Sequence, residues 1–382
     1  MRIGILWDVR TQWLGGWNYL LNMIRVCSVF APDMQFVVLS STDLAGAKRL
    51  EVESAGGEII VSLPPFRRFS HPLVLFGASH KGLNVQLASA RIDLIFELTN
   101  YLGSGLAVPA LSWIPDVQHR GIARFFSLRE RLQRDLEFWR RLTFRNHVML
   151  SSEAVRRDIR KFMPKPRAQL HVVPFAVQPT VEVTRDMIDQ VMARYGLLPG
   201  YVYMPNQFWL HKNHALVFEA VAELRTRRRD IKLVMSGQNL DSRDNSYAQR
   251  LERLITDLGI AESVVMLGVI PYADLLALIA GARALFNPSL FEGWSTTVEE
   301  AKALGGAMVL SDLAVHREQA GENAFYFDPG NLNAAADALE WASSLPVGAD
   351  TNSREKATKA NIASQRVYAE KLRVACIAAL NA

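Results

Sequence analysis

The chain has 382 residues, 49% hydrophobic and 21% charged, which excludes a disordered or fibrous protein and exceeds the size of one ordinary hydrophobic core, so two domains are expected. Two cysteines, Cys27 and Cys376, show no metal-binding or disulfide-framework spacing, which favours a reducing, cytoplasmic location. The net charge is +5, yet residues 120–167 hold fourteen Lys and Arg against five Asp and Glu, so positive charge is concentrated there.

Residues 1–7 form a charged apolar run that is too short for a secretion signal and predicts a buried strand. The longest apolar region, 264–286, is interrupted by Pro271, Asp274 and Arg283, so it cannot offer about 20 apolar residues to a bilayer. We expect no membrane span and a cytoplasmic protein that could contact the inner face of the cell membrane.

Short apolar runs alternate with amphipathic stretches along the whole chain, which is typical of parallel sheets with crossover helices. In the first half, strands are expected at 3–7, 35–39, 59–61, 94–98, 111–114, 147–150 and 171–173, with a helix at 17–30. In the second half, strands are expected at 201–204, 232–236, 264–267, 284–287, 308–310 and 324–327, with helices at 215–227, 248–258, 297–304 and 353–382.

Pro174, Pro179 and Pro199 surround a polar segment, which predicts an interdomain linker over 175–199. The first domain would comprise residues 1–174, the second 200–352, and the helix at 353–382 could cross back to the first. Open α/β sheets bind ligands beyond the carboxyl ends of their strands, so we expect the site in a cleft between the two sheets.

The basic region 120–167 has two interpretations. It can be an ordinary solvated helix surface, or it can attract anionic lipid head groups or a phosphorylated acceptor. Nucleic acid is not expected as a partner, because the region lacks the interleaved aromatic residues of a stacking platform.

In the first domain, Gly15 and Gly16 follow a loop over residues 8–14 and would let the backbone approach a ligand closely, although a simple turn also explains them. No GxGxxG motif supports dinucleotide redox chemistry. The segment 112–119, Ser-Trp-Ile-Pro-Asp-Val-Gln-His, leaves a strand end, and His119 there can accept from a hydroxyl or face a phosphate. A structural role for this histidine is the alternative.

In the second domain, Lys212 stands near a helix start, where acids are usually preferred. Residues 286–305 predict a strand, a turn and a helix opened by a capping box of Thr296 and Glu299. Exposed amides at that helix start favour an anion such as a diphosphate. Glu292 and Glu300 can accept from sugar hydroxyls, or can be acids favoured by the helix dipole.

The segment Phe291-Glu292-Gly293, with its spacing to Glu300, Leu304-Gly305 and residues 309–312, Val-Leu-Ser-Asp, resembles the signature of family-4 retaining glycosyltransferases of the GT-B fold. The resemblance implies two Rossmann-like parallel-sheet domains that face each other across a cleft. It also implies a nucleotide diphosphate sugar as donor, no cofactor and no required metal.

By this resemblance Glu292 contacts the donor sugar and Glu300 the ribose. Lys212 matches a lysine on the donor diphosphate, while Gln207 replaces the arginine that the family commonly has. His119 would lie near the reacting carbon, giving His119, Lys212 and Glu292 as the catalytic residues. The remaining expected contacts are Gly15, Gly16, Asp116, Asn206, Ser236, Gly237, Leu267, Val269, Phe291 and the phosphate-binding amides of Gly293, Trp294, Ser295 and Thr296.

The expected function is transfer of a hexose to a saccharide or lipid-linked acceptor in bacterial surface polysaccharide biosynthesis. A catalytically silent nucleotide-sugar-binding subunit is an alternative, since Gln207 replaces a charged residue. A nucleotide-sugar epimerase or a glycan phosphorylase on the same fold is another, although no pyridoxal lysine motif supports the phosphorylase.

Overall fold

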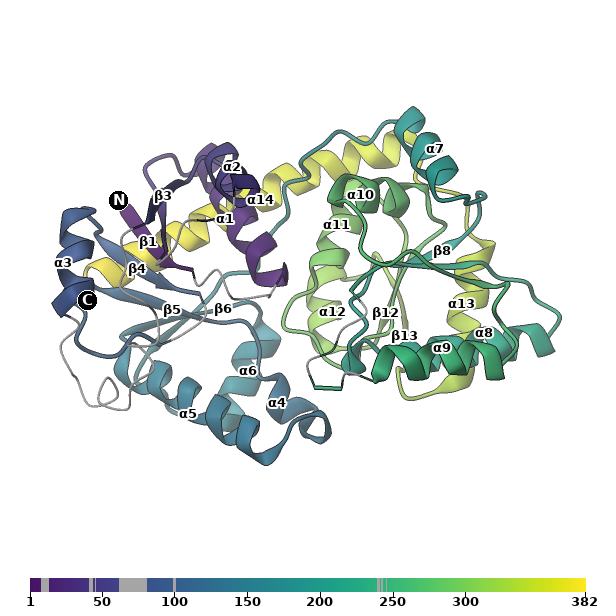
Figure 1. The fold of residues 1–382 in the computed structure, drawn as a ribbon, viewed down its shortest axis with the longest axis horizontal. Coiled ribbons are helices and arrows are strands. Elements are labelled where there is room, and N and C mark those ends of the chain that lie inside the picture. The colour runs from purple at the N-terminus through teal and green to yellow at the C-terminus, as the bar shows by residue number, and fades with distance from the viewer. Residues whose placement is uncertain are drawn as a thin grey trace. The chain divides into compact units, whose positions relative to one another are not determined.

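The computed structural model describes residues 1–7, 14–40, 44, 46–61, 81–98, 101–238, 241, 243–244 and 246–382. The chain forms two compact units (Figure 1). The first comprises Met1–Val117, Arg129–Gln178 and Ala363–Ala382, and the second comprises Gln118–Leu128 and Pro179–Ile362.

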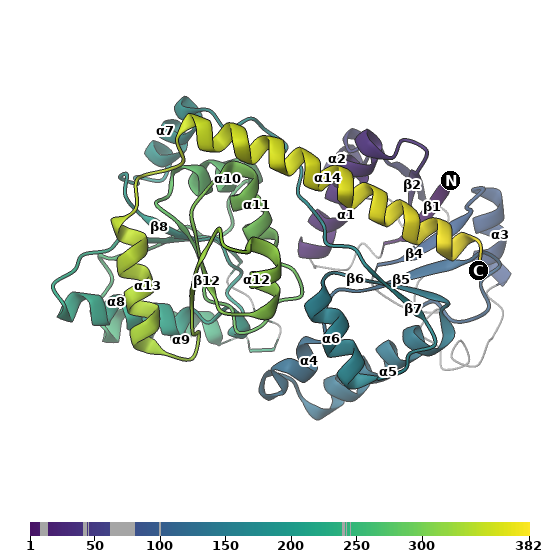
Figure 2. The same ribbon diagram turned by 180° about the vertical axis from the view of Figure 1, so that it is seen from behind.

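The first unit contains a seven-stranded parallel sheet in the order β3-β2-β1-β4-β5-β6-β7. Its strands are β1 (Arg2–Leu6), β2 (Gln35–Ser40), β3 (Glu58–Val61), β4 (Leu94–Glu97), β5 (Ala110–Ile114), β6 (His147–Leu150) and β7 (Gln169–Val172). Its helices are α1 (Leu14–Phe30), α2 (Gly46–Ser54), α3 (Lys81–Ser89), α5 (Leu128–Phe144) and α6 (Glu153–Phe162). Helices α1 and α2 lie over one face and α5 and α6 over the other (Figures 1 and 2).

Helices on both faces explain the uniformly apolar strands of this sheet. Strands β4 and β6 are buried along their whole length, whereas the edge strand β3 is exposed at both ends. All seven strands expected here are present, with ends shifted by no more than two residues.

The second unit contains a six-stranded parallel sheet in the order β10-β9-β8-β11-β12-β13. Its strands are β8 (Val202–Met204), β9 (Leu233–Met235), β10 (Val264–Met266), β11 (Leu285–Asn287), β12 (Met308–Ser311) and β13 (Phe325–Phe327). Its helices are α4 (Gln118–Gly121), α7 (Arg185–Arg194), α8 (His214–Thr226), α9 (Tyr247–Asp257), α10 (Tyr272–Gly281), α11 (Thr296–Leu304), α12 (Ala314–Ala320) and α13 (Leu332–Ser344), with short 3-10 turns at Ala123–Phe125 and Leu210–Lys212. All six expected strands are present.

Two apolar cores flank this second sheet. One joins α8, α9 and α13 through residues such as Val217, Leu251 and Leu339. The other joins α7, α10, α11 and α12, and it contains Ile188 and Val298. Burial on both faces fixes the sheet firmly, so the loops at its carboxyl ends have a rigid base.

The segment expected to be a linker, 175–199, contains the helix α7. Its Ile188, Val191 and Met192 belong to a core of the second unit, and Thr184 caps its first turn. The first unit continues to Gln178 and the second begins at Pro179, and the apolar spacing of residues 185–194 builds a packed helix rather than a linker.

The last helix, α14 (Thr351–Leu380), is divided between the units, because Ala363–Ala382 groups with the first. Tyr368, Leu372 and Cys376 are fully buried there, and the Tyr368 hydroxyl lies 3.3 Å from that of Tyr19 in α1. Burial raises the pKa of the Cys27 thiol to about 12, so this cysteine is protonated and inert. No helix in the described part of the chain is long and apolar enough to cross a bilayer.

Candidate active site

The strand order of the second unit places its topological switch point between β8 and β11. The chain runs from β8 outward to β10 and then returns to β11 on the other side of β8, so the connections after these neighbours diverge. Ligands of open α/β sheets bind at this switch point, beyond the carboxyl ends of the strands. Lys212 follows β8 and Glu292 follows β11, so both lie at this position.

Lys212 and Glu292 form an ion pair at this switch point, with 2.6 Å between Nζ and Oε1. Their side chains are only 13% and 9% exposed. Burial alone would raise the pKa of Glu292, but the Lys212 ammonium, His316 and hydrogen bonds from Lys212 and Ser289 together hold it below the usual value. Glu292 is therefore a carboxylate at neutral pH.

Asn213 ties together the loops that carry this pair. It adopts a left-handed conformation with φ of 59°, which asparagine tolerates better than most residues. Its Nδ2 donates to the carbonyls of Pro288 at 3.2 Å and Pro329 at 3.0 Å. The amide of Leu290 also donates to the His211 carbonyl at 2.8 Å, so the loops after β8, β11 and β13 form one rigid assembly.

Glu300 is the most perturbed acid of the site. It lies in α11 with 3% of its surface exposed, and its Oε2 has no hydrogen-bond partner in the part of the chain that the structure describes. Burial raises its pKa to about 8, against the smaller opposing effect of a hydrogen bond with Tyr272. A buried carboxyl with a vacant oxygen can bind a ligand hydroxyl.

The start of α11 corrects one prediction. Ser295 occupies the N-cap position without a side-chain capping bond, so the expected capping box of Thr296 and Glu299 is wrong. The carboxylate of Glu299 instead accepts from Lys302 at 2.8 Å and from Gln319 at 2.9 Å. The Glu299 side chain therefore bonds to Gln319 of α12 and not to the backbone at the start of α11.

The same glutamine changes the expected phosphate contacts. The Ser295 amide donates to Gln319 Oε1 at 3.1 Å, and Gln319 Nε2 donates to the Ser295 carbonyl at 2.7 Å. This amide is therefore already engaged. Gly293, Trp294 and Thr296 stay as the predicted phosphate-binding amides of this turn.

The loops after β8, β9 and β10 are joined through Gly237. Its φ is +150°, and a Cβ there would lie 2.4 Å from the Asn206 carbonyl oxygen, so only glycine fits. The Gly237 amide donates to the Gly268 carbonyl at 2.8 Å, and Gln207 Oε1 accepts from the Gln238 amide at 2.8 Å. The side-chain oxygen of Gln207 thus supports the loop after β9. Asn206 is buried, and its Nδ2 has no partner among the described residues.

We predict that Gly237→Ala lowers the free energy of unfolding by about 3 kcal/mol, because the added methyl group meets backbone atoms in a conformation disfavoured for L residues. Denaturant unfolding measures this. Gly268→Ala is the control: its φ is +68° but nothing lies within 4 Å of its added Cβ, so it should cost about 1 kcal/mol. Equal costs at the two positions would contradict the close approach.

The other residues expected at the base and ribose end differ in exposure. The Ser236 hydroxyl is buried 2.6 Å from that of Tyr203. Leu267 packs against a core, while Val269 is 68% exposed. Of these, only Val269 presents a large side chain to solvent.

His119 is fully buried in α4, which groups with the second unit although the sequence places it in the predicted first domain. A Cβ on Gly121 would lie 2.3 Å from the Phe291 ring, so α4 packs against the loop that carries Glu292. His119 and Phe291 are therefore parts of one packed region.

The structure leaves three expected contacts in the first unit. Gly15 and Gly16 lie in the first turn of α1 rather than in a loop, because this helix begins at Leu14, three residues earlier than expected. Asp116 follows β5. The loop expected over residues 8–14 falls, for 8–13, outside the described residues, and the cleft between the sheets stays a prediction.

Sequence reasoning missed His316. This fully buried residue of α12 donates from Nδ1 to the Ser311 carbonyl at 2.8 Å, and its Nε2 has no partner within the described chain. Burial lowers its pKa, as does the Lys212 charge. Its position five residues beyond Ser311 was the available signal, since Ser311 ends a strand at the site.

The described residues hold no group of three or more His, Cys, Asp or Glu that could bind a metal ion. That the reaction requires no metal stays a prediction.

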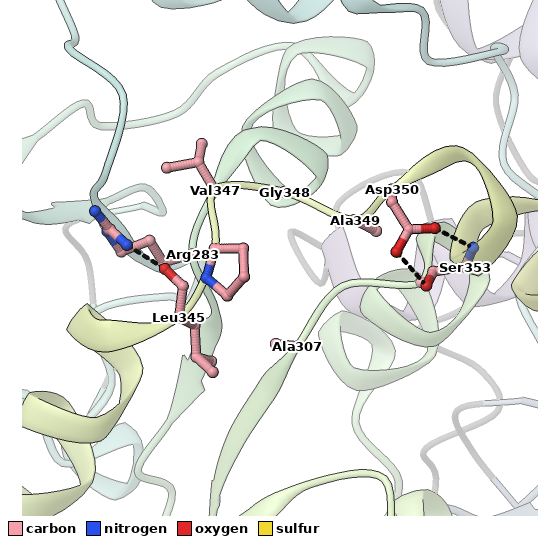
Figure 3. A pocket seen from close by; sticks show the side chains of 10 residues that line it. Arg283, Ala307, Leu345, Val347, Gly348, Ala349, Asp350 and Ser353 are labelled. Atoms are coloured by element: carbon pink, nitrogen blue, oxygen red, sulfur yellow. Dashed lines mark hydrogen bonds between the residues drawn. The ribbon is translucent and has the colours of Figure 1, made fainter.

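A pocket of about 340 Å³ lies at the amino ends of β11 and β12, where Arg283 donates to the Leu345 carbonyl and Asp350 accepts from Ser353 (Figure 3). None of the predicted site residues lines it.

The geometry of the second unit agrees with comparisons to known proteins. Residues 199–363 match the family model described as Glycosyl transferases group 1. All but the last of the matched residues lie in the second unit of the chain, and they include the Lys212–Glu292 pair. The chain is 29% identical over 100 residues to an O-antigen chain mannosyltransferase of Salmonella typhimurium, and 23% identical over 194 residues to a mannosylfructose-phosphate synthase of Agrobacterium fabrum. These alignments span 26% and 49% of the chain, and 28% and 41% of the relatives' own lengths.

The whole fold matches solved glycosyltransferase structures. The Anabaena protein HepE in complex with UDP-glucose aligns with a TM-score of 0.70 and 17% identity, covering 98% of this chain and all of that one. The predicted GT-B fold, with two parallel-sheet α/β domains, is confirmed. The family match and the named relatives support a glycosyltransferase.

Proposed function

We propose that this protein is a retaining, metal-independent glycosyltransferase that uses a nucleotide diphosphate sugar. The observation that carries the proposal is the buried Lys212–Glu292 pair at the switch point between β8 and β11. A cation and a carboxylate at this position suit a ligand that joins an anionic diphosphate to a polyhydroxylated sugar.

Each group has a distinct role toward such a donor. The Lys212 ammonium has three N–H donors, of which one bonds to Glu292, so it can also bind diphosphate oxygens. Glu292, held ionised, accepts from hydroxyls of the donor sugar. Glu300, with Oε2 vacant, binds the ribose hydroxyls, and Asn206 Nδ2 is a further buried donor in the neighbouring loop.

The reaction breaks the bond between the anomeric carbon and the diphosphate oxygen. The acceptor hydroxyl oxygen forms its new bond on the same face of the sugar, and its proton passes to the leaving phosphate oxygen. Lys212 and the amides at the start of α11 stabilise the negative charge that develops on the diphosphate. His119, two residues before the Gly121 that faces the Phe291 ring, is the proposed third catalytic residue.

The names of the relatives suggest which donor and acceptor to propose. One matched protein is named as an O-antigen chain mannosyltransferase, and a matched structure contains UDP-glucose. We propose that the chain adds a hexose to a saccharide or lipid-linked acceptor in the synthesis of a bacterial surface polysaccharide.

The experiment is a thermal-shift panel of UDP, GDP, ADP and their hexose conjugates on the whole chain. A ligand present at about 100 times its Kd stabilises the native state by about 2.7 kcal/mol, so one nucleotide series should raise the Tm clearly. The donor that binds is then incubated with the protein, with and without saccharide acceptors, and its consumption is followed. No shift with any nucleotide would overturn the proposal.

A silent nucleotide-sugar-binding subunit is the second candidate, and Gln207 is the observation that favours it. Its side-chain oxygen accepts from the Gln238 amide, and its neutral carboxamide supplies no positive charge to a diphosphate. Donor binding without consumption, across all acceptors tested, would select this candidate.

A further inference from the structure

Helix α5, which belongs to the first unit from Arg129 onward, carries large apolar side chains that point into solvent. Leu128, Leu132, Leu136 and Trp139 are 68%, 59%, 45% and 42% exposed. Their spacing of four, four and three residues places them on one side of the helix. We call these four residues the α5 stripe. The Phe144 ring, 41% exposed, adjoins it with its centroid 5.5 Å from that of Trp139.

Other side chains of α5 bond to the sheet and pack in the core, which keeps the stripe on the solvent side of the helix. Phe138 and Leu142 are buried beneath it. Arg141, 2% exposed, donates from Nη1 to the Trp113 carbonyl in β5 at 2.6 Å. Just beyond the helix, Arg145 forms two hydrogen bonds, of 3.0 and 2.5 Å, with the buried carboxylate of Glu97 in β4. Rotating α5 to hide the stripe would break this buried charge network.

Arginines lie along both edges of the stripe. On a helix of 3.6 residues per turn, Arg129 lies along one edge with Arg140, which is 16% exposed and 3.9 Å from Glu137, and Arg131 with Asp135 lies along the other edge. The neighbouring helix α6, over the same face of the sheet (Figures 1 and 2), adds the exposed side chains of Arg157, Arg160 and Lys161. An apolar stripe between cations, with a tryptophan on it, matches the boundary between acyl chains and anionic head groups.

We propose that the α5 stripe docks this protein on an anionic lipid bilayer, with the leucines and Trp139 inserted at the interface and the arginines on lipid phosphates. A second copy of the chain fits less well, because two such faces would bring like charges together. Nucleic acid would use the cations but leave the leucines in water. The proposal goes beyond sugar transfer and is independent of it, since the docking surface contains none of the proposed donor-binding residues.

The test is co-sedimentation of the whole protein with vesicles of phosphatidylcholine alone or with about 30% phosphatidylglycerol, at about 0.1 and 0.5 M NaCl. Binding should require the anionic lipid and weaken at high salt. L132S/W139S should lower the partition coefficient at least about tenfold, since each side chain loses the free energy of apolar burial. Val85→Ser is the matched control, because Val85 is equally apolar and 68% exposed on α3 of the same unit.

Two results would overturn the proposal. One is equal vesicle binding by L132S/W139S and the parent protein, with circular dichroism showing that both are folded. The other is a dimer in light scattering that the double variant abolishes, which would assign the stripe to a second copy. Loss of nucleotide-induced thermal shifts is not expected in either variant, so failure of this proposal leaves the proposed function testable.

Discussion

Lys212→Met combined with Glu292→Gln is expected to reduce sugar transfer by about 100- to 1,000-fold, comparable to the loss of a preorganised charge-stabilising group at other active sites. The double variant removes both charges of the 2.6 Å pair while keeping similar side-chain volumes. The measurement is kcat/KM for the donor that the thermal-shift panel identifies. Transfer within about tenfold of the parent protein would show that the pair is only structural.

The single variants separate folding from catalysis. Lys212→Met leaves the Glu292 carboxylate buried without its cation, which should cost about 3–5 kcal/mol of stability. The double variant should recover most of that stability and none of the activity. Arg194→Met is the control, since Arg194 pairs at 2.7 Å with the buried Asp274 between α7 and α10, and neither residue is one of the predicted contacts. It should lower stability and leave kcat/KM unchanged.

The sheets of this fold were predictable because their strands are buried on both faces. Such strands are continuous apolar runs, and each stands out against the amphipathic helices around it. Helix boundaries were less predictable. The start of α11 depends on Gln319, which is twenty-four residues from Ser295 in the sequence but bonded to it in space. Local capping rules do not include such long-range competition.

The sequence predicts candidate site residues but not their protonation states. The spacing of Glu292 and Glu300 indicated two acids that share a ligand. It could not show that Lys212 holds the first as a carboxylate, or that burial raises the pKa of the second to about 8. Asn213 acts through contacts with the loops after β11 and β13, so no local pattern marks it.

Glu300→Gln is expected to stabilise the protein at neutral and alkaline pH. The pKa of Glu300 in the folded state, about 8, lies above its ordinary value of 4.5. Between these two values the folded protein keeps a proton that the unfolded chain loses, so the free energy of unfolding falls as the pH rises, by up to about 1.4 kcal/mol per pH unit. Glutamine has no charge to bury, so the variant should lose this dependence and gain about 2 kcal/mol or more near pH 7.5.

Denaturant unfolding at pH 5, 6, 7 and 8, values chosen to span roughly this window, measures the difference. The gain should be small at the lowest pH and grow steadily toward the highest. Glu322→Gln is the control, because Glu322 is exposed and its removal should leave the pH profile unchanged. Parallel profiles for Glu300→Gln and the parent protein would mean that water or another group solvates this carboxylate. A nucleotide whose hydroxyls bond to Glu300 should stabilise the parent protein most at the pH values where Glu300 has lost its proton. That pH dependence would connect Glu300 with donor binding.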